Sequence, residues 1–497
     1  MIHFSTIRPD TLEGSYQPPY QEAHTLFQKL YPYSEYHFLM ESKRVSLFSG
    51  RFSLIGVDPV LKLIGKEEQF EIVGLNERSL HYFEQFTNDD FAICDDVELS
   101  NTQVFGRVKK QNRAIEESQR SKTHNIAQII RVLLEKFKTD EKCLMGLYGA
   151  MSYDFVRLFE DLEDQLEENG TNDFTLFLYD SFVFFDHIRQ ETFLKMYRQT
   201  KKAIQETVTE MLNQIDQSQP EQSSYQISKS SFSQSPIQFE TMVLKAKDYI
   251  RDGELFQVVL SNCLKAEFTG DPFALYLRYR ETNPSPYLFY YNFGDQQLVG
   301  ASPEMMVRYE DGMVHLRPIA GTAERGTDPV DDHEQMLSLL VNEKERAELD
   351  MLIDLGRNDL SRICKPGIQI ADYRFVEKYS RVMHTVAHLR GELKEGYIGL
   401  DALFSCLNAG TLTGAPKVAA MRMIEKHEIE RRGYYGGTVG QLTFSGEVDT
   451  GIIIRTAHIK DKQLSYQSGA GIVYDSDPAK EYQEVLNKAK AFLETFS

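Results

Sequence analysis

Two pairs of glutamates have a spacing that places each pair on one face of a helix. Glu345 and Glu348 are three positions apart, as are Glu481 and Glu484, and Lys488 lies one turn further on. Residues three or four positions apart are neighbours on a helix surface. If the two faces met, their carboxylates would suit Mg²⁺, which prefers oxygen ligands and keeps several waters. The spacing alone favours another interpretation, in which both faces are solvated and carry Glu–Lys pairs.

Three single side chains are further candidates. Arg455 follows three isoleucines, which suggests that it projects from a buried strand. A buried guanidinium requires a fixed anion, supplied by the protein or by a ligand, and a structural ion pair is the commoner case. Tyr435 precedes a pair of glycines, and His384, taken alone, is more often a satisfied core histidine than a catalytic group.

Three short segments could bring backbone groups close to a ligand. In RPIAGT (317–322), proline ends the strand pairing and glycine permits close approach, although an ordinary exit from a strand fits as well. The segment NAGTLTGAPK (408–417) departs from the GxxxxGK[ST] phosphate loop, because Ala-Pro precedes its lysine. Its turn could still hold a small anion where a helix opens. The segment SGAG (468–471) fits a ligand contact or a β-bulge equally.

The elements that must position these residues alternate between strand and helix patterns. Hairpins are expected at 287–300 and 305–318, each with a short turn at its centre. The other expected elements are helices at 333–354, 400–407 and 415–428, strands at 441–444, 451–459 and 464–467, and a last helix that Asp477 caps and Pro478 begins. This order predicts an α+β fold, an α/β sandwich of antiparallel sheets with helices outside.

The chain of 497 residues is long enough for several domain-sized units. Segment 214–238 is rich in Ser and Gln and lacks apolar periodicity, so we expect a surface linker between an N-terminal domain (1–213) and a C-terminal domain (239–497). The net charge of −19 disfavours nucleic acid and anionic membrane surfaces as partners. Five cysteines without CxxC spacing, no long apolar run and no signal-peptide pattern predict a reduced, cytoplasmic protein.

Taken together, the segments resemble the chorismate-utilising enzymes, and most closely the anthranilate synthase component I family. The resemblance covers nearly all of 239–497 and is patchier before it. The matching stretches are FLMES (38–42), GRFSLIG (50–56), GLYGAMSYDFVRLFE (146–160), FQVVLS (256–261), NPSPYLFY (283–290), VGASPE (299–304), RPIAGT (317–322), KERAELDMLIDLGRNDL (344–360), YSRVMH (379–384), NAGTLTGAPK (408–417), RRGYYGG (431–437), IIIRTA (452–457), QSGAGIVYDSDP (467–478) and EYQEVLNKAK (481–490).

The resemblance implies a role for each candidate. The implied Mg²⁺ ligands are Glu348 and Glu484, with Glu345 and Glu481 in support. The implied catalytic residues are Glu304, which protonates the departing C4 hydroxyl, His384, which assists pyruvate elimination, and Thr411, which contacts substrate. The implied substrate-binding residues are Gly321, Thr322, Tyr435, Arg455, Gly469, Ala470 and Gly471.

Two positions discriminate within the family. Relatives that add water to chorismate have a lysine base where this chain has Gln257, and relatives that make aminodeoxychorismate have lysine where it has Ala320. The implied reaction is therefore direct addition of ammonia at C2, followed by loss of pyruvate to give anthranilate, the first step of tryptophan biosynthesis. The alternatives are the same chemistry stopped at aminodeoxyisochorismate, and a non-catalytic paralogue that only binds tryptophan or a partner.

A partner and an effector are also implied. No segment resembles a glutamine amidotransferase, so glutamine use would require a separate glutaminase subunit that passes ammonia to this chain. The FLMES stretch resembles a tryptophan feedback site, which inhibits through coupling to the chorismate site. The implied inhibitor contacts are Ser42, Pro286, Tyr287 and Leu288. A helix-end cap is the other interpretation of the serine.

Overall fold

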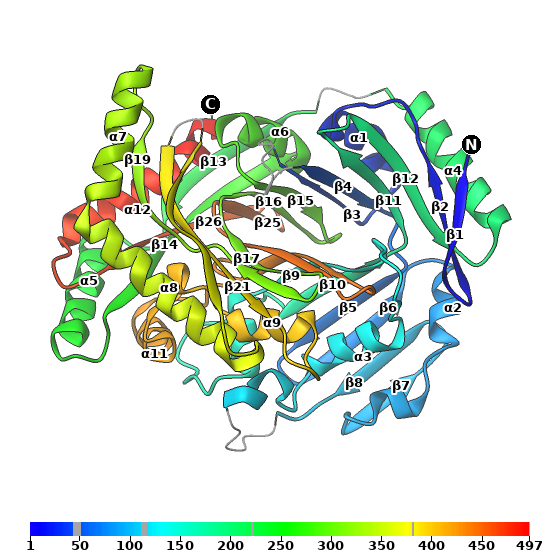
Figure 1. Ribbon diagram of the computed structural model, residues 1–497, viewed down its shortest axis with the longest axis horizontal. Helices are drawn as coiled ribbons and strands as arrows, with labels where there is room; N and C mark the ends of the chain where they lie inside the picture. The colour runs from blue at the N-terminus through cyan, green and yellow to red at the C-terminus, as the bar shows by residue number, and fades with distance from the viewer. Residues whose placement is uncertain (43–50, 111–116, 220–222, 380–381, 497) are drawn as a thin grey trace.

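Two large antiparallel sheets form the framework of the protein in a computed structural model (Figure 1). The structure describes residues 1–42, 51–110, 117–219, 223–379 and 382–496. The first sheet runs in the order β1 (His3–Arg8), β2 (Thr11–Tyr16), β12 (Glu191–Arg198), β11 (Ser181–Asp186), β4 (Phe52–Val57), β3 (His37–Glu41), β15 (Tyr287–Asn292), β16 (Gln296–Ser302), β25 (Thr456–Lys460), β26 (Gln463–Ile472), β14 (Gln257–Gly270) and β13 (Tyr225–Phe232), with β22 (Gly414–Ala415) also beside β14.

The second sheet lies across the first. Its order is β19 (Ile319–Glu324), β21 (Val382–Glu392), β18 (Met313–Leu316), β17 (Met305–Glu310), β24 (Val448–Ile452), β23 (Thr438–Thr443), β9 (Gly146–Met151), β10 (Phe174–Tyr179), β5 (Leu61–Lys66), β6 (Gln69–Gly74), β8 (Gln103–Arg107) and β7 (Asp96–Leu99), with β20 (Gln369–Lys378) also beside β21. The named strand pairs are antiparallel in both sheets, as predicted.

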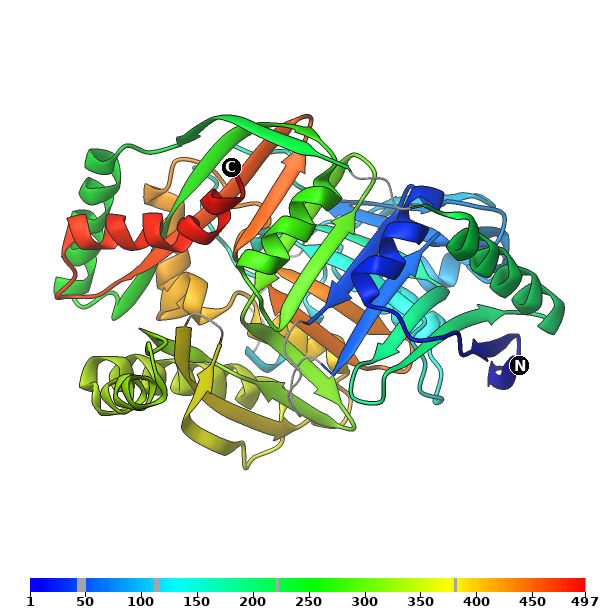
Figure 2. The ribbon, with the colours of Figure 1, turned by 90° about the horizontal axis from the view of Figure 1, so that it is seen from above.

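Helices cover the outer faces of both sheets. They are α1 (Ala23–Leu30), α2 (Ser79–Phe83), α3 (Gln128–Lys136), α4 (Lys201–Gln217), α5 (Pro236–Arg251), α6 (Pro272–Thr282), α7 (Pro329–Val341), α8 (Glu343–Ile363), α9 (Gly399–Cys406), α10 (Gly410–Thr413), α11 (Lys417–His427) and α12 (Pro478–Leu493). Figure 2 shows α1, α4, α6 and α12 over the first sheet. No helix of the described residues is long and apolar enough to cross a membrane.

The first sheet is apolar on both faces, which explains why its central strands lack polar alternation. In β15, Phe289 and Tyr291 belong to the core between the sheets, whereas Leu288 and Tyr290 belong to the core under the helices. Successive side chains of a strand point to opposite faces, so a strand buried on both faces reads as a continuous apolar run. The sequence predicted this strand correctly from such a run and its flanking turn.

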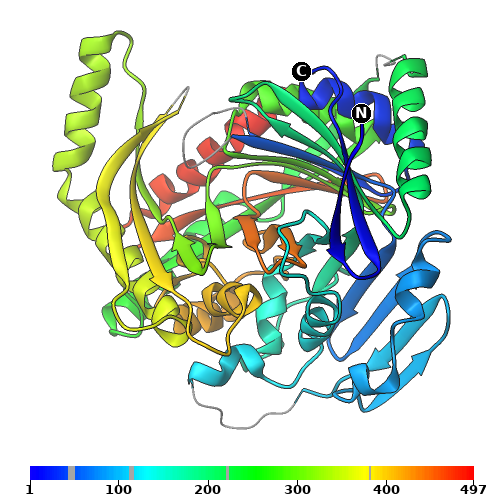
Figure 3. The same cartoon turned by 45° about the vertical axis from the view of Figure 1, so that its right-hand side comes forward.

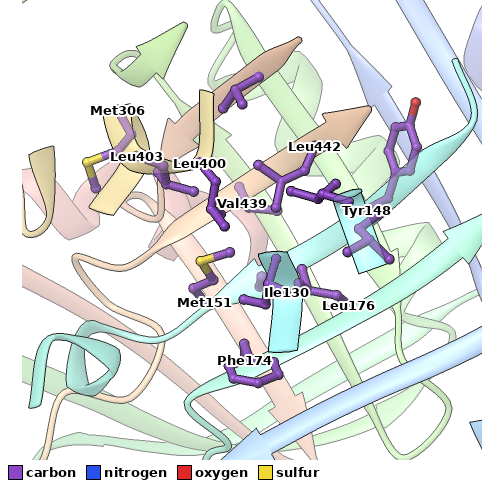
Figure 4. Packing of buried hydrophobic residues seen from close by; sticks show 14 of the residues in the cluster. Ile130, Tyr148, Met151, Phe174, Leu176, Met306, Leu400, Leu403, Val439 and Leu442 are labelled. Carbon is purple, nitrogen blue, oxygen red and sulfur yellow. The ribbon is translucent and has the colours of Figure 1, made fainter. Parts of the chain in front are cut away.

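The outer face of the second sheet packs against α3 and α9. Figure 4 shows Ile130 of α3 and Leu403 of α9 near Met151, Val439 and other side chains of the sheet. Alternating apolar residues on the strands and an apolar stripe on each helix meet here, which is the layered packing that an α/β sandwich requires. The helices therefore lie outside, as predicted.

Each sheet combines strands from 1–213 with strands from 239–497. The two sets join at β3 with β15 in the first sheet and at β9 with β23 in the second. The expected surface linker 214–238 contains a strand, β13, which pairs with β14 at the sheet edge. Its alternating Ser and Gln side chains suit a solvated edge strand, and that composition resembles a linker. The division into two domains stays a prediction.

Two expected elements are each divided in the structure. The helix expected at 333–354 is α7 followed by α8, with Asn342 between them. The Asn342 side-chain oxygen accepts hydrogen bonds from the backbone N–H groups of Lys344 (3.0 Å) and Glu345 (3.2 Å), so it caps the start of α8. As a result α7 extends to the outer edge of the molecule, while α8 turns back beneath the sheets (Figure 3). The strand expected at 451–459 is two strands, β24 and β25, in different sheets.

Substitution of Phe38 tests the packing between the two sheets. It is fully buried on β3, and its ring stacks on Tyr148 of β9 with 5.0 Å between centroids. We expect Phe38→Ala to lower the free energy of unfolding by about 3–5 kcal/mol, because a large cavity would remain. Urea unfolding measures this. Phe105→Ala is the matched control, since that side chain is 41% exposed; an equal loss in both variants would contradict the assigned core.

Candidate active site

The crossover between the two sheets positions Arg455. β24 of the second sheet ends at Ile452 and β25 of the first begins at Thr456, so the predicted buried strand through Arg455 is wrong. The isoleucines are apolar because this segment passes through the core between the sheets. Arg455 has a left-handed backbone, with φ of 49°. Its carbonyl accepts hydrogen bonds from Ala301 N (3.1 Å) and Tyr279 Oη (3.2 Å), which hold this unusual conformation.

The charge of Arg455 is not neutralised by an ion pair. Its half-buried guanidinium forms no salt bridge with any residue that the structure describes, contrary to the commoner expectation of a structural pair. The positive charge nevertheless acts on two neighbouring titratable groups, because it lowers the pKa of both Glu304 and His384. A half-buried cation without a protein partner favours an anionic ligand.

Glu304 is a buried carboxyl group that holds its proton. It lies directly before β17 and is 7% exposed. Burial raises its pKa to about 8, although the Thr411 hydroxyl and the Arg455 charge oppose that rise. Thr411 Oγ1 faces this carboxyl but has no well-formed hydrogen bond among the described residues. At neutral pH Glu304 is therefore a proton donor, as a general acid must be.

A β-bulge places Gly321 and Thr322 against His384. Ala320 pairs with Thr385 and Ala323 with Met383, so two residues of β19 stand opposite the single His384 of β21. Gly321 has φ of 69°, a conformation that glycine adopts without strain. This bulge explains why both residues of the GT pair face the histidine.

The hydrogen bonds of His384 fix its tautomer. Nδ1 lies 2.9 Å from Gly321 O and 3.0 Å from Thr322 Oγ1. A carbonyl only accepts, so Nδ1 carries the proton and Nε2 keeps its lone pair. Burial, followed by the Arg455 charge, lowers the pKa of His384 to about 4. The imidazole is therefore neutral at pH 7 and can accept a proton.

The two glutamate pairs approach each other from α8 and α12. Burial raises the pKa of Glu348, and repulsion from Glu345 and then Glu484 adds to the rise. Burial and repulsion from Glu484 likewise raise the pKa of Glu481. The two faces are therefore close enough for their charges to interact, although Glu484 itself is exposed. Lys488 pairs with Glu484 at 2.8 Å.

The described residues contain no group of three or more His, Cys, Asp or Glu already gathered as a metal site. Glu345 nevertheless lies beside the bulge, since a Cβ added at Gly321 would come within 2.7 Å of Glu345 Oε2. Carboxylate oxygens are the donors that Mg²⁺ prefers, so the residue types fit such an ion.

The segment Gly469–Gly471 lies at an uncovered part of β26. It pairs on one side with Ser261, Leu260 and Val259 of β14. On its other side, β25 pairs with β26 only as far as Tyr466. Alternate backbone amides beyond that point therefore have no strand partner and can meet a ligand.

Side chains close this part of the site. Lys488 donates to Gly469 O at 2.8 Å, and Tyr435 Oη would lie 2.7 Å from a Cβ added at Gly469. The Gln257 amide covers Gly471 in the same way, and its buried Oε1 has no hydrogen-bond partner among the described residues. A cavity of about 450 Å³ lies beyond Tyr435, lined by Gln467 and His458 among others, and does not reach Glu304 or His384.

The predicted inhibitor residues also come together. β3 pairs with β15 so that Glu41 stands opposite Leu288, which brings Ser42 beside Pro286 and Tyr287. Tyr287 points toward the second sheet, where its hydroxyl donates to Asp449 Oδ1 at 2.9 Å. The sequence analysis did not identify the buried ion pair of Glu428 and Arg432 beside the site. The RRGYYGG stretch, which contains the arginine, was the part of the sequence that could have indicated it.

Comparisons with known proteins show the family to which the chain is similar. The model of a family described as chorismate binding enzyme matches residues 85–494. Anthranilate synthase component 1 of Aquifex aeolicus is 41% identical over 368 residues, which cover 70% of this chain and 73% of that protein. The protein of the same name from Neisseria meningitidis serogroup B is 42% identical over 390 residues, with 74% and 79% covered.

Two solved structures share the fold. Anthranilate synthase component I from Streptococcus pneumoniae superposes with a TM-score of 0.73 and 33% identity, covering 90% of this chain and 94% of that one. MenF, the menaquinone-specific isochorismate synthase from Escherichia coli, has a TM-score of 0.70 at 16% identity, covering 99% and 96%. The second likeness is one of fold alone.

The neutral state of His384 has a consequence for stability. Its pKa falls from an ordinary 6.5 to about 4 on folding, so the folded protein binds fewer protons than the unfolded chain between these values. The contribution of His384 to the free energy of unfolding is fully present above about pH 6.5. It falls as the pH drops toward 4, and about 2 kcal/mol of it is lost at pH 5. The His384→Asn variant keeps a donor toward Gly321 O. Between pH 7.5 and 5, we expect its free energy of unfolding in urea to fall by about 2 kcal/mol less than that of the wild type.

His333→Asn on the exposed face of α7 is the matched control for that comparison and should follow the wild type. If His384→Asn also follows the wild type, the imidazole is not buried in its neutral form.

Proposed function

The chain belongs to the chorismate binding enzymes, among them to the anthranilate synthase component 1 family, and we propose that it converts chorismate and ammonia to anthranilate and pyruvate. The observation that carries the proposal is the guanidinium of Arg455, which has no ion-pair partner among the described residues and whose charge acts on both a protonated acid, Glu304, and a neutral base, His384. Groups whose surroundings push their pKa values in opposite directions are typical of acid and base assignments in an active site.

In this proposal the two carboxylates of chorismate bind at opposite ends of the site. Arg455 and Tyr435 bind the enolpyruvyl carboxylate, and the amides of Gly469–Gly471 bind the ring carboxylate, with Thr322 lining the pocket. The cationic end of the site then selects a dianionic substrate although the whole chain is acidic.

Each reaction step uses a group in the protonation state that the structure supports. Ammonia adds at C2 while Glu304 donates its proton to the departing C4 hydroxyl, which leaves as water with Thr411 nearby. His384 Nε2 then accepts the C2 proton as the bond to the enolpyruvyl oxygen breaks, and the methylene carbon gains a proton to give pyruvate. Formation of the aromatic ring drives this elimination. Gln257 stands where a water-adding enzyme needs a base, which agrees with ammonia as the nucleophile.

Mg²⁺ is part of the proposal, with Glu348 and Glu484 as ligands and Glu345 and Glu481 in support. Repulsion among these carboxylates is relieved when a divalent cation binds, which supports the assignment. When bound, the ion supplies positive charge for the ring carboxylate. Lys488, which now pairs with Glu484, would remain bonded to Gly469 O.

A separate glutaminase subunit as the source of ammonia and tryptophan as a feedback inhibitor complete the proposal. Relatives named component 1 support a second component. The pairing of β3 with β15 supports the effector site, because it gathers Ser42, Pro286, Tyr287 and Leu288.

Metal dependence tests the proposed function directly. Purified chain with chorismate, ammonium and Mg²⁺ at pH 8 should form fluorescent anthranilate and an equal amount of pyruvate, and EDTA should stop the reaction. We expect Glu348→Gln to lower the rate by at least about 100-fold, since even residues that only support metal ligands contribute roughly 10–100-fold. Glu343→Gln, exposed on the first turn of the same helix, should retain the wild-type rate.

The outcomes separate the candidates. An aminated product without pyruvate means that the reaction stops at aminodeoxyisochorismate. The absence of any product from wild type with Mg²⁺ and ammonium rejects an enzyme and leaves a binding protein.

Tryptophan inhibition tests the effector site. We expect Ser42→Ala to raise the tryptophan concentration for half-inhibition by about 2- to 10-fold, the value of one lost hydrogen bond, without changing the uninhibited rate. Ser228→Ala, exposed on β13 at an edge of the same sheet and far from β3 in the strand order, is the matched control. Unaltered inhibition in Ser42→Ala would remove the serine from the effector site.

A further inference from the structure

A buried ion pair outside the proposed catalytic groups joins Arg432 to Glu428. The two side chains are 1% and 3% exposed, with Nη2–Oε1 at 2.6 Å and Nε–Oε2 at 2.9 Å. The cost of burying two charges usually cancels their attraction, so such a pair is a weak source of stability. Its position and its further contacts therefore require another explanation.

The pair is hydrogen bonded to the strand that carries the uncovered part of β26. Arg432 Nη2 donates to Val259 O at 2.7 Å. Glu428 Oε1 accepts from Ser261 N at 3.0 Å and from Ser261 Oγ at 2.7 Å. Val259 and Ser261 are the residues of β14 that pair with Gly471 and Gly469. The ion pair thus fixes the backbone against which the proposed carboxylate-binding amides are aligned.

The same guanidinium contacts two other parts of the proposed site. Its Nη1 donates to Leu412 O at 2.6 Å, and Leu412 directly follows Thr411. Its central carbon lies 5.5 Å from the ring centroid of Tyr435 and 4.8 Å from that of Tyr153, within the range of cation–π attraction. One side chain therefore contacts Val259 of β14, Leu412 of α10 and the ring of Tyr435.

We propose that Arg432, oriented by Glu428, is a positioning residue that sets the relative places of Gly469–Gly471, Thr411 and Tyr435. This inference rests on the proposed function, in which those groups contact chorismate. The planar guanidinium serves two carbonyls, a carboxylate and two rings at fixed angles. The single ammonium of lysine cannot do so, although it would preserve the charge.

Arg432→Lys tests the inference, with Arg198→Lys as its matched control. Arg198 on β12 is similarly buried, pairs with Asp180 at 2.9 Å and donates to Ser181 Oγ of β11 at 2.7 Å. These strands carry none of the proposed catalytic or binding groups. Both variants should lower the melting temperature. We expect only Arg432→Lys to raise the KM for chorismate and to lower kcat/KM for it by about 10- to 100-fold, because small displacements of binding groups are costly. The KM for ammonium should stay within about 2-fold of wild type in both.

Glu428→Asp provides a second variant should Arg432→Lys fail to fold, and it should show the same selective effect on chorismate. A merely structural role would reduce the folded fraction, and with it kcat, while leaving the KM for chorismate unchanged. Wild-type activity together with variants that match Arg198→Lys overturns the inference. Wild-type protein that forms no anthranilate instead rejects the proposed function.

Discussion

The rest of the site depends on the guanidinium of Arg455, which lies where the chain crosses from one sheet to the other and has no carboxylate partner in the part of the chain that the structure describes. The left-handed backbone of Arg455 is retained because Ala301 N and Tyr279 Oη bind its carbonyl. Both donors belong to the first sheet and its covering helix α6, so the packing of that layer stabilises the strained residue. Arg455 therefore provides a fixed positive charge at a half-buried position, where electrostatic interactions are stronger than in water.

The surrounding groups respond to this charge and to burial in opposite ways. Burial outweighs the charge at Glu304 and keeps the carboxyl group protonated, whereas at His384 both effects act together and keep the imidazole neutral. Acid and base can therefore coexist in one small region without forming an ion pair. At the glutamates of α8 and α12, burial and mutual repulsion raise the pKa of Glu348 and Glu481, and the proposed Mg²⁺ would relieve that repulsion.

Sequence patterns were sufficient for elements whose signal is local. The turns of the hairpins and the Asp477-Pro478 start of α12 were predicted correctly, since a residue type fixes the backbone there. The break at Asn342 was missed because an apolar repeat ran through both helices. The crossover at Arg455 was missed because apolar residues occur both in a strand and in a segment that passes through a core. The protonation states of Glu304 and His384 depend on burial by distant segments, so no local pattern carries them.

Both sheets contain strands from the two halves of the chain, and this arrangement also links the proposed effector residues to the proposed active site. Tyr287 belongs to the first sheet, yet its ring packs on Gly451 and its hydroxyl binds Asp449, both in β24 of the second. β24 leads directly into the segment that ends at Arg455. Since cores are close packed, a ligand that displaces Tyr287 must also shift β24 or leave a cavity behind. A response at Arg455 to the proposed effector would therefore need only this one strand, because Tyr287 contacts β24 and β24 leads into the crossover that carries the arginine.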